Sequence, residues 1–238
     1  MEAVSQEFPP DSNVTVERRQ LAEVGPDQSK PVLRGVIHQV AFFVSVASGL
    51  ALIIAAPTAG SKAVMVLYAA SISCLFGTSA LFHRHTWGPV GRRRMRRADH
   101  SMIFLAIAGS YTAVAGIALD GWARTTVLCI VWAGALFGIA LRQLWLDAPK
   151  WAIAIPYVTV GWAALVALPQ FWRAIGPTGS VLLLLGGFAY SAGAVVYALK
   201  RPNPVPGVFG YHEVFHACTV VGAVLQGVAI AWFVLPLA

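Results

Sequence analysis

Two histidines near the carboxyl end of the chain have the spacing of a metal-binding pair. The segment 211–216 reads Tyr-His-Glu-Val-Phe-His, so His212 and His216 are four residues apart. Residues at this spacing share one face of an α-helix, where two imidazoles can bind one transition-metal ion. A third histidine, His83, ends an earlier apolar segment, and Asp99 begins the next one. Polar, metal-competent side chains are costly in an apolar chain, so they mark a candidate functional site.

These residues fit a zinc site of the open, catalytic kind. Zn²⁺ accepts neutral imidazole at about 2.0–2.1 Å, and three protein ligands leave one position for water. His83, His212 and His216 can supply the three ligands. Bound zinc lowers the pKa of its water to about 7 and so generates a hydroxide that can attack a carbonyl group. We expect Asp99 to orient or deprotonate that water, and Ser79, one turn before His83, to hold a ligand or a substrate carbonyl.

The same pair is a literal His-Glu-x-x-His sequence, the pattern in which zinc metalloproteases use the glutamate as general base. An intramembrane metalloprotease with Glu213 as its base is therefore an alternative interpretation. No further ligand is expected after His216, because Gln226 is the only polar amide in the rest of the chain and Cys218 is interpreted as a small buried apolar residue. The third histidine must come from upstream in either case.

The elements that position these residues are predicted to be membrane helices. Of the 238 residues, 58% are hydrophobic and only 11% are charged, unlike a soluble domain. Seven apolar runs are long enough to cross a bilayer, which takes roughly 20 residues. They cover residues 36–56, 62–83, 99–119, 125–146, 151–168, 179–199 and 211–236. This pattern predicts an all-α membrane protein with a bundle of seven transmembrane helices.

The distribution of Lys and Arg predicts the orientation of the bundle. These residues concentrate in cytoplasmic loops, and five arginines fall within residues 92–97, in the expected loop between the second and third spans. With that loop inside, fourteen of the seventeen Lys and Arg residues are cytoplasmic. The N-terminus is then cytoplasmic and the C-terminus lies outside. His83, Asp99 and the histidine pair reach the same depth, just within the cytoplasmic leaflet.

The rest of the chain has plainer interpretations. Residues 1–34 are polar, which predicts a disordered cytoplasmic tail before a transmembrane domain of residues 35–238, and they show no signal peptide. The net charge of +7 is attributed to membrane topology and anionic headgroups, and no nucleic acid is expected as a partner. The expected location is the cell membrane, with membrane lipids as partners.

Three further histidines lie close to the predicted site, and one glycine pair lies within a predicted helix of the bundle. His38, His85 and His100 lie near the cytoplasmic helix ends, and we interpret them as neighbours of the site or interfacial residues, not ligands. Gly134 and Gly138 form a GxxxG pair, which indicates close helix packing within the bundle.

Three motifs taken together resemble the hemolysin III family, bacterial relatives of the progestin and adipoQ receptors. The motifs are Ser79-x-x-x-His83, Asp99-His100-Ser101 leading to Ala108-Gly109-Ser110-Tyr111-Thr112, and His212-Glu213-x-x-His216. The resemblance runs from about Gly35 to the C-terminus. Phe82 and Ala113 depart from the family pattern, at positions peripheral to the metal.

The resemblance implies a seven-helix bundle with an inward N-terminus and a zinc ion held by His83, His212 and His216. It also implies that Asp99 and Ser79 lie beside the zinc-bound water. The chain is similar to the alkaline ceramidases as well, which implies hydrolysis of a lipid amide in a cavity open to the membrane.

Three functional hypotheses follow. The leading one is a zinc-dependent membrane hydrolase that acts on lipid amides or related acyl bonds. The second is a membrane-homeostasis or sensor protein with structural zinc and no turnover, and the third is a pore-forming hemolysin. Asp99 separates the first two, because a structural zinc site is usually closed by four protein ligands.

Overall fold

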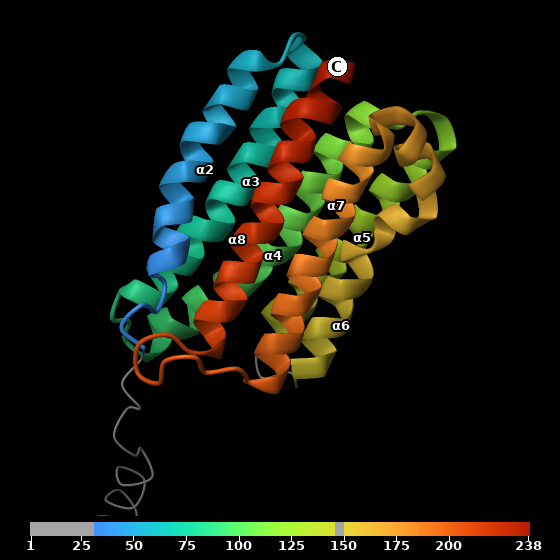
Figure 1. The fold of residues 1–238 in the computed structure, drawn as a ribbon. Coiled ribbons are helices and arrows are strands. Elements are labelled where there is room, and N and C mark those ends of the chain that lie inside the picture. Colours follow the sequence, from blue (N-terminus) through green and yellow to red (C-terminus); the bar gives the residue numbers. More distant parts are fainter. Residues whose placement is uncertain (1–30, 146–149) are drawn as a thin grey trace, which may run out of the picture.

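The protein is a bundle of long helices (Figure 1). The computed structural model describes residues 31–145 and 150–238, without the side chains of residues 150–154. Within these residues the β-structure is a single bridge between Val205 and Phe209. The helices are α2 (Val36–Ala55), α3 (Ala59–Arg84), α4 (Pro89–Ala118), α5 (Gly121–Leu144), α6 (Lys150–Gly161), η1 (Ala163–Ala167), α7 (Leu168–Leu199), α8 (Tyr211–Ala229), η2 (Ile230–Val234) and η3 (Leu235–Leu237).

The outer surface of the bundle is apolar. The side chains of Phe43, Phe137, Phe188 and Trp232 are all more than half exposed, as expected where lipid tails and not water surround the helices. Six helical stretches are long and apolar enough to cross a membrane: Val36–Ala55, Ala59–Arg84, Pro89–Ala118, Gly121–Leu144, Ile155–Leu199 and Tyr211–Leu237. The prediction of an all-α, multi-pass membrane protein is confirmed.

The fifth of these stretches contains two of the predicted spans. A straight helix of 45 residues would be about 68 Å long, twice the thickness of a bilayer core. The chain instead breaks near Trp162, and again at Gly176, whose φ is 69°. The indole Nε1 of Trp162 donates a hydrogen bond to Ser191 Oγ at 3.0 Å. The stretch therefore folds back on itself, and Figure 1 shows α6 beside α7.

Tyr111 of α4 holds the first of these breaks. Its hydroxyl donates to the carbonyl oxygen of Gly161 at 2.7 Å and accepts from the backbone N–H of Ala164 at 2.8 Å. Backbone groups freed at a helix break must find partners when no water is near. One tyrosine satisfies a carbonyl on one side of the break and an amide on the other.

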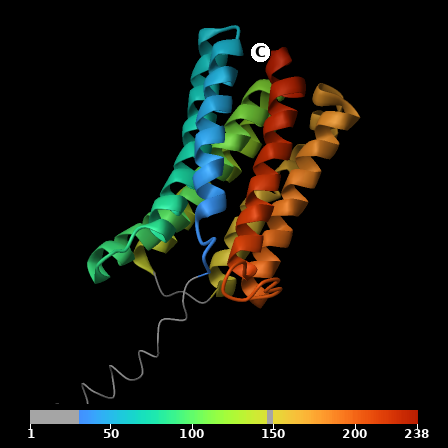
Figure 2. The same cartoon turned by 60° about the vertical axis from the view of Figure 1, so that its left-hand side comes forward.

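The third predicted span begins earlier than expected. We expected a start at Asp99 after an arginine-rich loop, but α4 begins at Pro89, so the arginines of residues 92–97 lie on a helix. Pro89 suits the first helical position, where the missing N–H costs nothing, and arginine is a good helix former. Figure 2 shows these first turns extending sideways from the bundle at the end where α8 begins.

Two glycines let α5 pack closely against its neighbours. A Cβ atom at Gly138 would lie 2.1 Å from the ring of Phe104 in α4, and one at Gly134 would lie 2.5 Å from Val160 in α6. Both glycines of the GxxxG pair thus serve packing within the bundle, as the sequence indicated.

The start of α2 is bound to the loop that leads into α8. Residues 1–30 of the predicted tail lie outside the described residues. In its last part, the backbone N–H of Val32 donates to Gly207 at 3.1 Å and that of Leu33 donates to Val208 at 3.2 Å. Figure 1 shows α2 and α8 beginning at the same end of the bundle. The end of α3 lies there as well, so three elements that carry histidines meet.

The predicted orientation can be tested with two single cysteines. Ala59 and Thr86 are exposed near opposite ends of α3. In a chain whose native cysteines Cys74, Cys129 and Cys218 are replaced by alanine, we expect Ala59→Cys to react with an impermeant maleimide on intact cells. Thr86→Cys should react only after lysis, because the arginines beside it favour the cytoplasm. The opposite pattern of labelling would place the arginine-rich end outside.

Candidate metal centre

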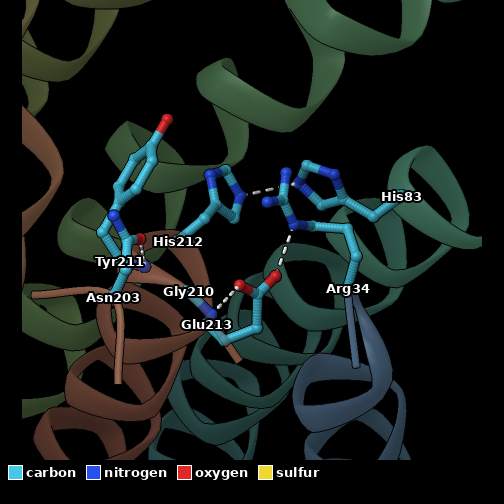
Figure 3. Close-up of polar contacts among 7 residues, drawn as sticks. All are labelled: Arg34, His83, Asn203, Gly210, Tyr211, His212 and Glu213. Atoms are coloured by element: carbon cyan, nitrogen blue, oxygen red, sulfur yellow. Dashed lines mark hydrogen bonds and ion pairs between the residues drawn. The ribbon is translucent and has the colours of Figure 1, made fainter. Parts of the chain in front are cut away.

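Three histidines from two helices meet at the end of the bundle where α8 begins. His83 lies in the last turn of α3, and His212 and His216 lie in the first two turns of α8. Figure 3 shows His83 and His212 with their rings turned toward each other, and their Nε2 atoms are 3.1 Å apart. One ring nitrogen from each histidine lies within 4.8 Å of the other two. The structure thus brings together the three predicted ligands.

This arrangement fits a zinc ion. Around tetrahedral zinc, nitrogens that lie about 2.0–2.1 Å from the metal are about 3.3 Å from one another. The separation between His83 and His212 is close to that value. Imidazole is a preferred ligand of zinc, and three protein ligands leave a fourth position open, as in catalytic zinc sites.

The three rings differ in exposure and in their surroundings. His216 is only 2% exposed, whereas His83 and His212 are partly exposed. Tyr197 of α7 packs edge-on against His212, with ring centroids 5.6 Å apart. The site therefore has a deep side at His216 and a more open side at the other two histidines.

Glu213, between the two histidines of α8, binds Arg34 and the backbone of Gly210 and is not part of the ligand group. Glu213 has no exposed surface. Arg34 donates from Nε to one carboxylate oxygen, and the backbone N–H of Gly210 donates to the other at 2.8 Å (Figure 3). Both oxygens are thus engaged with the start of α2 and the first turn of α8. This arrangement gives no support to Glu213 as the base of a metalloprotease.

Arg34 also places a positive charge beside the histidines. Its guanidinium interacts electrostatically with His212 and His216. An unpaired cation at this position would repel a metal ion, but Glu213 neutralises the charge of Arg34 through a direct ion pair. A further restraint on the first turn of α8 comes from Asn203, whose Oδ1 accepts from the backbone N–H of Tyr211 at 2.9 Å.

Asp99 lies outside the group of three ligand nitrogens. Its carboxyl group is hydrogen-bonded to the side chain of Ser79, which is 3% exposed and lies one turn before His83 on α3. The two residues predicted to act beside the metal are therefore linked, and Ser79 connects Asp99 to the helix turn that carries His83. Asp99 is therefore joined to the turn of α3 before His83 and is not a member of the histidine group.

Two of the other histidines are placed as the sequence indicated. The Nδ1 atom of His100 is 2.8 Å from the carbonyl oxygen of Arg96 and 3.6 Å from a carboxylate oxygen of Asp99. His85 is exposed at the end of α3 and packs against Trp87. Neither belongs to the ligand group.

Two buried side chains make contacts in this region that the sequence analysis did not predict, although it did interpret His38 as a neighbour of the site or an interfacial residue. Arg142, counted only as a topological charge, has no exposed surface and interacts electrostatically with Asp99. His38 is 2% exposed and stacks directly on His216. A charge inside a predicted span was an available signal for Arg142, whereas no local pattern pointed to the stacking of His38.

Comparisons with known proteins agree with these motifs. Residues 27–227 match the protein family described as "Haemolysin-III related". The chain is 29% identical to Hemolysin-3 of Bacillus cereus over 210 residues, which cover 87% of this chain and 93% of that protein. It is 28% identical to the Hemolysin-3 homolog of Bacillus subtilis (strain 168) over 195 residues, which cover 81% of this chain and 88% of that protein. No solved structure matches the chain.

The ion pair between Arg34 and Glu213 can be tested by stability. Arg34→Leu should lower the free energy of unfolding by about 3–5 kcal/mol, because it leaves a buried carboxylate without its partner. Adding Glu213→Gln should recover part of this loss, since the amide carries no charge. Thermal unfolding in detergent measures both effects. Asp120→Asn, which breaks the exposed pair with Arg124, is the control and should change little. Wild-type stability in Arg34→Leu would contradict this role.

Proposed function

The chain belongs to the haemolysin-III related family, and we propose that it is a zinc-dependent hydrolase of lipid amides or related acyl bonds in the membrane. The convergence of His83, His212 and His216 carries the proposal, together with the contact of Asp99 with Ser79 one turn before His83. The similarity to the alkaline ceramidases supplies the substrate class. The apolar surface around the bundle supports access from the bilayer.

The proposal includes a topology with seven crossings, in which α6 and α7 are separate spans. In Figure 1 the first described residues and the C-terminus lie at opposite ends of the bundle, which supports an odd number of crossings. The bias of Lys and Arg supports a cytoplasmic N-terminus and an outside C-terminus. The site then lies near the cytoplasmic face, and the cell membrane is the proposed location.

Each residue of the site has a distinct part in this reaction. The three histidines would hold zinc, which as a Lewis acid polarises a carbonyl group and activates water. Asp99 accepts the proton from the attacking water and is the general base. Ser79 donates to the Asp99 carboxylate and orients it, while Arg142 balances its charge in the low-dielectric interior. This division leaves the histidines free to act as ligands.

A structural zinc site in a non-enzymatic sensor is the second candidate. Such a site is usually closed by four protein ligands, and Asp99 would be the fourth. Its oxygens lie outside the ligand group formed by the three histidines. This placement favours an open fourth position, and with it the hydrolase.

The first prediction from this proposal concerns metal content. We expect stoichiometric zinc in the purified wild-type protein, measured by elemental analysis. The double variant His212→Ala, His216→Ala keeps one of the three ligands and should lose the metal. His85→Ala removes an exposed histidine outside the group and should keep it. Full zinc occupancy in the double variant would rule out the site.

The second prediction separates chemistry from metal binding. Asp99→Asn should keep zinc but lower the rate of lipid-amide hydrolysis by about 10²–10⁴-fold, the usual contribution of a general base. Glu213→Gln should have a milder effect, because Glu213 binds Arg34 and Gly210 and is not the proposed base, and the amide oxygen of Gln can still accept one of these two hydrogen bonds. Mass spectrometry of fatty acid released from lipid amides in proteoliposomes measures the rate.

The outcomes of this experiment distinguish the alternatives. An inactive Glu213→Gln beside an active Asp99→Asn would favour the metalloprotease-like arrangement. A zinc-containing wild-type protein that cleaves none of the lipid amides or related acyl lipids tested would favour the structural zinc site.

A further inference from the structure

His38 of α2 is a buried histidine that contacts the ligand group without belonging to it. Its ring is 2% exposed and lies face to face with the ring of His216, with centroids 3.7 Å apart and planes inclined by 8°. The ring of Phe76 in α3 packs against His38 as well, at 5.1 Å and 58°. The imidazole of His38 is thus fixed by contacts with α3 and α8.

The buried Nδ1 atom of His216 gives its ring no hydrogen-bonded restraint within the described residues. A metal-binding histidine normally donates its second ring N–H to a carboxylate, a carbonyl oxygen or water, and this bond sets the direction of the ring. The flat contact with His38 is the shortest of the ring contacts that His216 makes and the one that is face to face, so it is a restraint that can set the plane of this ring.

The stacked geometry argues against His38 as a fourth ligand. A metal ion lies close to the plane of each imidazole that binds it, about 2.0–2.1 Å from the nitrogen. Two nearly parallel rings with centroids 3.7 Å apart cannot both hold one ion in their planes. The ring nitrogens of His38 also lie outside the ligand group.

We propose that His38 is a positioning residue for His216, acting through the face of its ring. The stack holds the imidazole of His216 in the plane that directs one nitrogen toward His83 and His212. Both nitrogens of His38 are buried and form no hydrogen bond of normal geometry within the described residues, although the backbone of His216 lies near the ring. The ring face is therefore the part of His38 that contacts the site. This role rests on the proposed zinc site.

Three substitutions at position 38 distinguish the effect of a flat ring from the effect of apolar bulk alone. His38→Phe keeps a flat ring, His38→Leu keeps apolar bulk without one, and His38→Ala removes both. Competition with a chromogenic chelator measures zinc affinity, and the visible absorption of the Co²⁺-loaded protein reports ligand geometry. We expect His38→Phe to stay close to wild type. The Leu and Ala variants should bind zinc about 10–100-fold more weakly, the usual loss when a group that orients a ligand is removed.

Each outcome has one meaning. Equal zinc affinity in the Phe and Leu variants, or wild-type affinity in all three, would overturn the proposal, since a flat ring would then not matter. A Phe variant as weak as the Ala variant would also overturn it, because the nitrogens of His38 would then be required. Failure of the wild-type protein to bind zinc would instead remove the metal site itself. His85→Ala is the control and should match wild type in both measurements.

Discussion

The buried carboxylate of Glu213 is the constraint on which the arrangement of the site depends. A charge without exposed surface needs partners, and these come from two places: the guanidinium of Arg34 before α2 and the backbone N–H of Gly210 before α8. Satisfying Glu213 therefore fixes the start of α2 against the start of α8. His38 on α2 lies about one turn after Arg34 and His216 lies about one turn after Glu213 on α8, so the stacked rings are close along the chain to this contact. A buried ion pair of this kind adds little net stability, but it selects one relative placement of the two helices.

Much of the fold follows from apolar length alone. Runs of about 20 residues without charge left few alternatives to membrane helices, and the starts of α2 and α8 were predicted at Val36 and Tyr211, where the structure has them. The start of α4 was missed because a run of arginines was interpreted as a loop. Hydrophobicity marks where a helix enters the membrane but not where it begins, and Pro89 was the local signal for the beginning.

Some features of the site could be predicted from residue spacing, whereas others depend on how the helices pack. The four-residue spacing of His212 and His216 predicted that they share one face of a helix. The predicted depth of His83 in the membrane correctly indicated that it lies near them. Ser79 and Asp99 were each predicted beside the metal, but the hydrogen bond between them was not predicted. The stack of His38 on His216 depends instead on the rotation of α2 about its axis. Contacts across the bundle set that rotation, so a single sequence does not encode it in any local pattern.

The charges around the histidines indicate what else such a site would need. Arg34 and Glu213 form one pair, and Arg142 and Asp99 interact as a second. These charges cancel, and the three imidazoles are neutral when they act as ligands. A zinc ion held there would add two positive charges in a low-dielectric surrounding, where uncompensated charge is costly. Since Asp99 is already engaged with Ser79 and Arg142, part of the compensation would have to come from the group at the open fourth position. A site of this charge balance favours a ligand whose oxygen gains negative charge, which is the change a carbonyl group undergoes when it is attacked.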